Sequence, residues 1–278
     1  IWYIYQITMG VNEMKNDEKI KEFKSIARSR LEQDSRSVYM LTQLRHLMVT
    51  IKEDIGLPKR VTAEQMIKIL ESSKKLKIIK LSFPSQKYTR YTWGEKSIYD
   101  LLSSLNGDAY YSHLSALYFH KLLETEASEI YLNVEQSQKS GYSSAMHQEN
   151  IDKAFSRPPR ITRNVASYQQ WRIFLLNGMY TDRMGVIKMT GPKKQKILVT
   201  DLERTLIDIA VRPHYSGGVA NVLNVYKKAV RNVSIDKMVN RLKELNYSYP
   251  YHQSIGFYLE SSGLTSESSI FGEAFPIQ

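Results

Sequence analysis

The spacing of apolar residues changes between residues 62 and 93, and this change restricts the fold of the N-terminal third more than any other feature. Thr62 can cap a helix and Gln65 occupies the reciprocal position of a capping box, so a helix is predicted over Thr62–Ser73. Apolar residues then alternate over residues 76–83, and a second alternating run covers residues 88–93. Because a turn-prone Pro-Ser-Gln-Lys segment separates the two runs, they predict a β-hairpin.

Two further amphipathic helices are predicted before this one, over residues 16–35 and 37–52, because apolar residues recur there every three or four positions. In the third helix, Met66, Ile69 and Leu70 are expected to face the core. Three helices followed by a basic hairpin is the order of a winged helix-turn-helix, whose third helix enters the major groove of DNA. We therefore predict a winged helix-turn-helix DNA-binding domain over residues 1–96, with residues 1–8 interpreted as a leader outside the native start.

The net charge of the chain is concentrated in this N-terminal third. Lys and Arg number 39 against 28 Asp and Glu, a formal charge of +11. Residues 59–96 alone hold 10 basic and 3 acidic side chains. Such a concentration is typical of a surface that binds a polyanion, with nucleic acid as the leading candidate. The alternative is a solvated basic face that binds nothing.

Candidate DNA-binding residues follow from the predicted helix and hairpin. Cations at the helix end and on the hairpin can neutralise phosphates, whereas neutral polar side chains on the helix can reach base edges. A winged helix that contacts protein instead of DNA is the alternative. The candidate residues are Gln65 and Ser72 for the bases, and Lys68, Lys74, Lys75, Lys77, Lys87 and Arg90 for the phosphates.

Several classes of site are excluded by composition. The chain has no cysteine, which excludes a disulfide framework, a thiolate zinc site, an iron–sulfur cluster and a cysteine nucleophile. No apolar stretch approaches the roughly 20 residues that a membrane span requires. We expect a cytoplasmic protein that makes no contact with a membrane.

Catalytic motifs are also missing from the sequence. It contains no HExxH, no P-loop, no GxGxxG and no GxSxG. His113 and His120 could share a helix face, but no carboxylate stands at a ligand-like spacing beside them. Asp201, Glu203 and Asp208 could form a nuclease cluster, although Glu203 is better explained as a helix cap and Asp208 as the partner of an arginine. We predict no enzyme activity, metal or cofactor.

Residues 97–278 mix predicted helices with short predicted strands, so the chain is expected to be a helix-rich α+β protein with an α/β domain in this second part. Gln136–Gln148 is polar and is interpreted as an exposed loop. Helices are predicted over residues 97–106, 111–123, 200–211, 219–230, 234–245 and in the tail after residue 249, and strands over residues 129–134, 171–177, 185–189 and 197–199.

The segment at residues 196–218 combines several polar signals. Thr200 can cap the helix that follows, with Glu203 completing a capping box. Arg204 and Asp208 are four residues apart and can pair on one helix face. Two interpretations remain open: these groups tie the helix to the following Gly-rich turn, or they form a surface for a partner or ligand.

Several motifs resemble one known family. They are RYTW at residue 90, AYYSHLSALY at 109, IYLNVEQ at 130, LERTLID at 202, RPHYSGG at 212 and YPYHQSIGFYLE at 249. In this order they resemble the AbiEi family, the antitoxins of bacterial type IV toxin–antitoxin systems associated with phage defence. The matching blocks span about two-thirds of the chain. The motif residues singled out are Arg204, Asp208, Arg212, Tyr215, Gly217, Gly218, Tyr251, His252 and Gln253.

The resemblance implies that the two parts of the chain have different functions. Members of the family bind operator repeats through an N-terminal winged helix and repress their own operon. Their C-terminal domain, placed here at residues 97–278, neutralises a toxin of the nucleotidyltransferase class. The prediction is therefore an autorepressing antitoxin that binds double-stranded operator DNA, with a transcription regulator lacking any toxin partner as the alternative. The sequence leaves monomer and dimer open.

Overall fold

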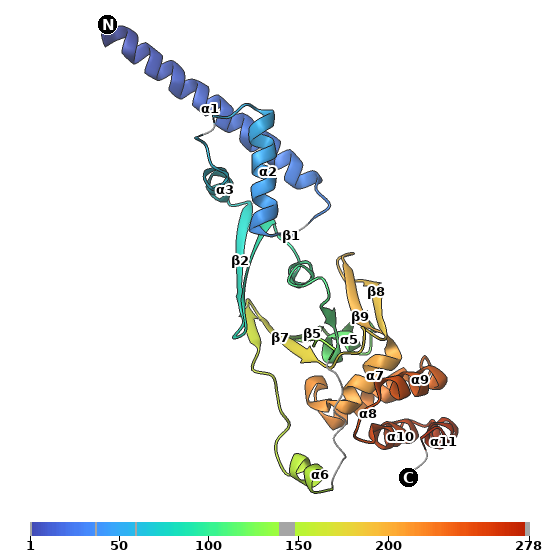
Figure 1. The fold of residues 1–278 in the computed structure, drawn as a ribbon. Coiled ribbons are helices and arrows are strands. Elements are labelled where there is room, and N and C mark those ends of the chain that lie inside the picture. Colours follow the sequence, from blue (N-terminus) through green and yellow to red (C-terminus); the bar gives the residue numbers. More distant parts are fainter. Residues whose placement is uncertain (1, 37, 59, 139–147, 276–278) are drawn as a thin grey trace. The chain divides into compact units, whose positions relative to one another are not determined.

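The computed structural model describes residues 2–36, 38–58, 60–138 and 148–275 (Figure 1). The chain is α+β, as predicted, and forms two compact units. The first unit contains Ile1–Leu81 and Lys87–Leu105, so it extends past residue 96. The second contains Ser82–Gln86 and Asn106–Gln278.

The first unit consists of helices and one three-stranded antiparallel sheet of order β1-β3-β2. The hairpin lies where the alternating pattern predicts it, whereas the predicted helices over residues 16–35 and 37–52 have other bounds. The first of them begins much earlier, and a short strand precedes the second. The elements are α1 (Trp2–Gln33), β1 (Val38–Tyr39), α2 (Leu41–Asp54), α3 (Ala63–Glu71), β2 (Leu76–Ser82), β3 (Lys87–Trp93) and α4 (Ile98–Ser103).

The start of α3 confirms the predicted capping box. The backbone N–H of Gln65 donates to Oγ1 of Thr62 at 3.2 Å, and the backbone N–H of Thr62 donates to Oε1 of Gln65 at 2.9 Å. The helix buries Met66, Ile67 and Leu70 against α1 and α2 side chains. Ile69, predicted to be buried, is half-exposed, because the nine-residue helix turns Ile67 toward the core in its place.

The second unit has a six-stranded mixed sheet of order β6-β7-β5-β4-β9-β8. β5 pairs with β7 and β4 with β9 in parallel, while the other neighbours are antiparallel. The strands are β4 (Tyr110–Tyr111), β5 (Glu129–Glu135), β6 (Val165–Tyr168), β7 (Trp171–Gly178), β8 (Val186–Thr190) and β9 (Lys196–Thr200).

Helices of the second unit form its main core. Ile207, Val222, Met238, Ile255 and Phe271, each from a different helix, are at most 1% exposed and belong to one cluster. In Figure 1 the last of these helices, coloured orange to red, gather beside the sheet. The helices are α5 (His113–Phe119), α6 (Gln148–Phe155), α7 (Leu202–Val211), the 3-10 helix η1 (Pro213–Ser216), α8 (Val219–Ala229), α9 (Ile235–Leu245), α10 (Tyr251–Glu260) and α11 (Thr265–Glu273).

Five elements of this unit were not predicted, namely β4, β6, α6, η1 and α11. The predicted helix over residues 111–123 is shorter, because Tyr110 and Tyr111 pair with β5 and β9 before α5 begins. The predicted loop Gln136–Gln148 lies mostly outside the described residues, since 139–147 are not among them.

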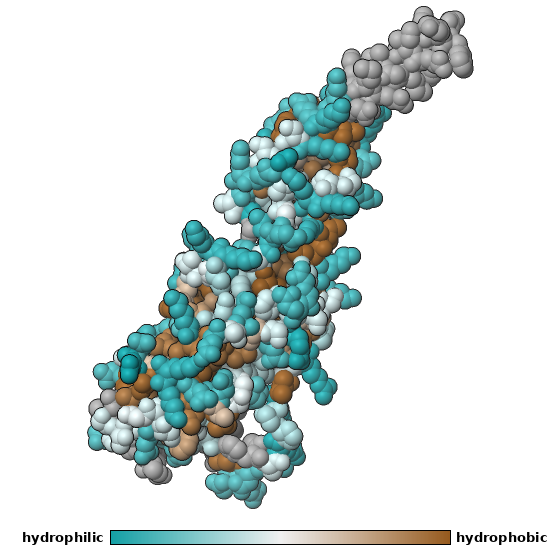
Figure 2. All heavy atoms as spheres, turned by 180° about the vertical axis from the view of Figure 1, so that it is seen from behind, coloured by the Kyte–Doolittle hydropathy of each residue, from teal (hydrophilic) through white to brown (hydrophobic). Residues whose placement is uncertain are grey.

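The visible surface is largely hydrophilic, with apolar patches between polar side chains (Figure 2). Across the described ranges, we find no helix with the length and apolar character needed to cross a bilayer.

Candidate functional site

The first candidate site is the basic face of α3 and the β2–β3 hairpin. Lys68 on α3, Lys74 after its end and Lys87 at the start of β3 are all exposed. Within the described ranges none of the three forms an ion pair, so their charges are available to a ligand. Lys80 on β2 has the same properties and was not singled out from the sequence. Its place on the outward side of an alternating strand was the signal that could have identified it.

Lys75 and Lys77 differ from these lysines because each has an acidic neighbour. The Lys75 ammonium lies 3.7 Å from Glu32, and Lys77 pairs with Glu95. All four side chains are more than two-fifths exposed, so the pairs are weak and a phosphate can compete for the lysines.

The two residues proposed to read bases have partners in their own helix. Gln65 is exposed and its Oε1 caps α3, while its amide N–H₂ group forms no hydrogen bond within the described residues. The Ser72 hydroxyl donates to the carbonyl of Ile69 at 2.7 Å. Gln65 therefore keeps two donors for a base edge, whereas Ser72 keeps only acceptor capacity.

Arg90 does not belong to the basic face, which corrects the prediction from the sequence. It is 7% exposed, and its Nη2 donates to the carbonyls of Ser104 at 2.8 Å and Leu105 at 3.3 Å. Its Nη1 donates to the carbonyl of Thr89 at 3.0 Å. Burial lowers the pKa of this guanidinium. Arg90 therefore holds β3 to the end of α4, and its burial keeps it from serving as an exposed phosphate contact.

The second candidate site is a pocket of about 490 Å³ within the second unit. It opens where the ends of β5 and β7 meet α7 and the start of α10. Its polar and aromatic lining is formed by Ser112, His113, Asn133, Arg160, Arg204, Asp208, Arg212, Tyr215, Tyr247 and Tyr251.

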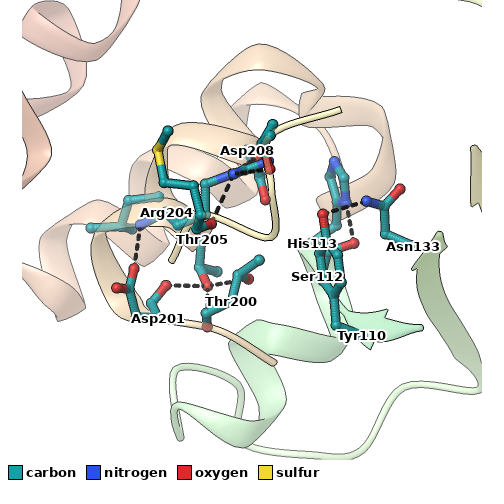
Figure 3. A network of polar contacts seen from close by, with 12 residues as sticks. Tyr110, Ser112, His113, Asn133, Thr200, Asp201, Arg204, Thr205 and Asp208 are labelled. Atoms are coloured by element: carbon teal, nitrogen blue, oxygen red, sulfur yellow. Dashed lines mark hydrogen bonds and ion pairs between the residues drawn. The ribbon is translucent and has the colours of Figure 1, made fainter. Parts of the chain in front are cut away.

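Arg204 and Asp208 form the charged floor of this pocket (Figure 3). Nε of Arg204 donates to Oδ1 of Asp208 at 2.8 Å, and the side chains are only 6% and 8% exposed. Nη1 of Arg204 also donates to the carbonyl of Met184 at 3.0 Å. Burial opposes the charge on Arg204, but the attraction of Asp208 keeps its pKa raised, while burial raises the pKa of Asp208. The predicted pair is confirmed, and it is buried.

The cap of α7 differs from the prediction. Asp201, not Thr200, caps the helix by accepting from the backbone N–H of Arg204 at 2.9 Å. Glu203 does not complete a capping box, because its carboxylate accepts from the backbone N–H of Ser234 at 3.1 Å and from Lys237 at 2.7 Å. These contacts attach α7 to the start of α9 and orient the face that carries Arg204.

His113 lines the pocket from the start of α5. Its Nδ1 shares a hydrogen bond of 2.9 Å with Oγ of Ser112, and its backbone has a φ of 50°. Burial, together with the charges of Arg212 and Arg204, lowers the pKa of His113 to about 3, so the imidazole is neutral at pH 7. His120 lies at the other end of α5, where its Nε2 donates to the carbonyl of Thr200 at 2.7 Å. Within the described ranges no group of three or more His, Asp or Glu side chains is arranged to hold a metal ion.

Aromatic residues form one wall of the pocket. The Tyr215 hydroxyl accepts from the backbone N–H of Thr162 at 2.8 Å, and its ring packs edge-on against His113 with centroids 5.3 Å apart. The rings of Tyr247 and Tyr251 are also edge-to-face, at 5.2 Å. The hydrogen bond between Thr162 and Tyr215 thereby holds the segment before β6 against η1, beside the Arg204–Asp208 pair of the pocket.

The pocket brings together five of the nine motif residues, namely Arg204, Asp208, Arg212, Tyr215 and Tyr251. Gly217 and Gly218 instead form the turn before α8, with φ values of 80° and 88° that favour glycine. His252 stacks on Phe275 at 5.2 Å, and Gln253 is exposed. The pocket also contains residues that the motifs did not indicate, among them Ser112, His113, Asn133, Arg160 and Tyr247, of which His113 was considered only as a metal ligand.

Comparison with known proteins gives a likeness in fold. No model of a known protein family and no curated protein matches the sequence. The fold is similar to the crystal structure of the RV2827C protein from Mycobacterium tuberculosis, with a TM-score of 0.60 over 92% of this chain and 83% of that chain. At 14% sequence identity, this likeness concerns the fold alone.

Proposed function

We propose that the chain is the antitoxin of a bacterial type IV toxin–antitoxin system and an autorepressor of its operon. In this proposal the first unit binds double-stranded operator DNA, and the second neutralises a co-encoded nucleotidyltransferase toxin. The chain acts in the cytoplasm, takes part in phage defence and has no catalytic role of its own.

The observation that carries the DNA-binding half is the arrangement of α3 and the hairpin. The order α1, β1, α2, α3, β2, β3, with β1 paired to β3, supports the proposed winged helix. On α3, the side chains of Gln65 and Lys68 are exposed while Met66, Ile67 and Leu70 hold the helix on its core. The helix is therefore supported on one face and open on the other, as major-groove recognition requires.

Exposed lysines of the first unit supply the second support. Lys68, Lys74, Lys80 and Lys87 are exposed and come from the helix, its end and both hairpin strands. Each cation that meets a phosphate releases counterions, so the affinity for DNA falls steeply with salt. These lysines set affinity and register, and Gln65 is the residue proposed to contribute sequence preference.

A binding titration tests this half. The full chain is titrated with the duplex that lies upstream of its own gene and with a scrambled duplex of equal composition, at several salt concentrations. The expected result is a preference for the native duplex. Lys68→Ala and Lys87→Ala should each make the log–log salt slope shallower by about one, whereas Lys227→Ala on α8, an exposed lysine of the second unit, should leave it unchanged. Equal, weak binding to both duplexes would contradict the proposal.

The antitoxin half rests on the motif residues that the pocket brings together and is tested separately. A nucleotidyltransferase encoded beside this gene is expressed in a bacterium with and without the chain. The proposal expects growth arrest by the toxin and relief of that arrest by the chain. If the chain binds its operator DNA but does not relieve the growth arrest, the protein is a transcription regulator without a toxin partner.

A further inference from the structure

The pocket of the second unit, whose motif residues support the antitoxin proposal, also has a surplus of positive charge. Three arginines line it against one carboxylate, Asp208. Arg204 is already paired with that carboxylate, which leaves Arg160 and Arg212. Both are exposed, and within the described ranges neither forms an ion pair. A guanidinium is suited to binding an oxyanion through two parallel hydrogen bonds, so the rim of the pocket is suited to a phosphate.

The same pocket presents apolar and aromatic surface to solvent. Ile161 is 57% exposed and Met179 is 45% exposed, high values for large apolar side chains, and both line the pocket. Tyr251 also lines the pocket, and its ring is held edge-on by Tyr247. A planar ring placed on this wall would cover apolar surface that is otherwise in contact with water.

The floor carries polar atoms with no partner among the described residues. Oδ1 of Asp208 accepts from Arg204, while its second carboxylate oxygen carries no hydrogen bond in that part of the chain. His113 uses Nδ1 toward Ser112, which leaves Nε2 for a ligand. A carboxylate oxygen and a neutral imidazole that line the same pocket can accept from and donate to the edge of a heterocyclic base.

We propose that this pocket binds a nucleoside monophosphate. Its phosphate lies on Arg160 and Arg212, its base lies against Tyr251, and the edge of the base faces Asp208 and His113. A cavity of about 490 Å³ is within the range of roughly 300–1,000 Å³ that is usual for small-ligand sites. The site is separate from the basic face of α3 and is independent of whether the chain binds DNA or a toxin.

Isothermal titration calorimetry of the full chain tests the proposal. The probes are AMP, GMP, CMP and UMP, with inorganic phosphate and the uncharged nucleosides as partial ligands. At least one monophosphate is expected to bind with a Kd below about 100 µM, in the affinity range of ordinary metabolite sites. Phosphate and nucleoside alone should each bind at least about tenfold more weakly, because each makes only part of the contacts.

Variants identify the site. Arg212→Ala should weaken nucleotide binding by about tenfold to a hundredfold, the loss expected for hydrogen bonds to a charged group. Arg231→Ala, an exposed arginine after α8 that does not line the pocket, is the matched control and should bind as the parent does. Thermal unfolding of each variant establishes that it is folded. If Arg212→Ala were unfolded, Arg160→Ala would serve in its place.

Three outcomes would overturn the proposal. The first is no binding of any of the four monophosphates up to millimolar concentration. The second is inorganic phosphate binding as tightly as every nucleotide, because the aromatic wall would then contribute nothing. The third is an equal loss in Arg212→Ala and Arg231→Ala, because net charge and not the pocket would then account for the binding.

Discussion

Nε of Arg204 lies 2.8 Å from Oδ1 of Asp208, and neither side chain is more than a tenth exposed. When one partner of a buried ion pair is removed, the remaining charge keeps its desolvation cost but loses the attraction that compensated for it. Asp208→Ala is therefore expected to lower the free energy of unfolding by about 3–5 kcal/mol. Urea denaturation at pH 7 measures this change.

The exposed pair Arg28–Glu32 is the control for that measurement. Its atoms are 2.9 Å apart, but the side chains are 59% and 45% exposed. Glu32→Ala should cost less than about 1 kcal/mol. Equal losses at the two pairs would show that burial does not determine the strength of the Arg204–Asp208 interaction.

His113 makes the stability of the second unit depend on pH. Its folded pKa of about 3 lies below the ordinary value of 6.5, so between these values only the unfolded chain binds a proton at this residue. The free energy of unfolding then falls as the pH falls below 6.5, by up to about 1.4 kcal/mol per pH unit from this group. His113→Asn should reduce this slope between pH 7.5 and 5.5, and asparagine tolerates the left-handed backbone at this position.

Unfolding titrations at several pH values check the His113 prediction. His46→Asn on α2, where the histidine is exposed, is the control and should keep the parent slope. A parent slope retained in His113→Asn would show that the imidazole is not the group responsible.

The Gln65→Glu variant distinguishes the role of Gln65 in capping α3 from its proposed role in contacting bases. A glutamate at this position can still accept from the backbone N–H of Thr62, so stability should change by less than about 0.5 kcal/mol. The amide donors are lost, and glutamate favours cytosine where glutamine favours adenine. The preferred operator base at one position should therefore change, as measured by binding to a library of duplexes. An unchanged preference would remove Gln65 from the set of base contacts.

Arg90 and Lys87 lie on the same strand, but their replacement by alanine should affect different properties, stability for Arg90 and DNA affinity for Lys87. Arg90→Ala removes hydrogen bonds from a buried guanidinium and is expected to lower the free energy of unfolding by about 1.5–3 kcal/mol. The affinity of the folded fraction for DNA should stay within about twofold. Lys87→Ala should leave stability unchanged and reduce DNA affinity. Parallel titrations and melting curves distinguish the two, and a selective loss of DNA binding in Arg90→Ala would contradict this assignment.

Short-range signals account for what the sequence predicted well. The capping box of α3 depends on Thr62 and Gln65, three residues apart, and the hairpin depends on alternation within two adjacent runs. Arg90 was misassigned because residues 90–93 are buried in succession, so alternation no longer indicates which side chains reach solvent. The cap of α7 was misplaced by one residue, because β9 continues through Thr200 and Asp201 takes the cap.

Only part of the pocket could be predicted, because most of its residues come from segments that are distant in sequence. Arg204 and Asp208 are close in sequence, and their pairing follows from helix geometry. Ser112, Asn133 and Tyr247 reach the same pocket from the start of α5, from β5 and from the turn after α9. Strand pairing and helix packing between residues distant in sequence bring these elements together. The left-handed backbone of His113 is also unreadable from sequence, since histidine has no strong preference for it.

Because one edge of β5 pairs with β7 and not with the strand that follows it in sequence, β5 is synthesised well before the strand that covers this edge. Glu129 stands opposite Arg172, 43 residues later, whereas β2 and β3 are joined by a four-residue turn. At elongation rates of about 5–20 residues per second, β7 follows β5 out of the ribosome by about 2–9 s. Throughout that interval one backbone edge of β5 has no strand beside it, and Ile130 and Leu132 are not yet in the core. The yield of correctly folded chain should therefore depend on the speed of translation across residues 135–178.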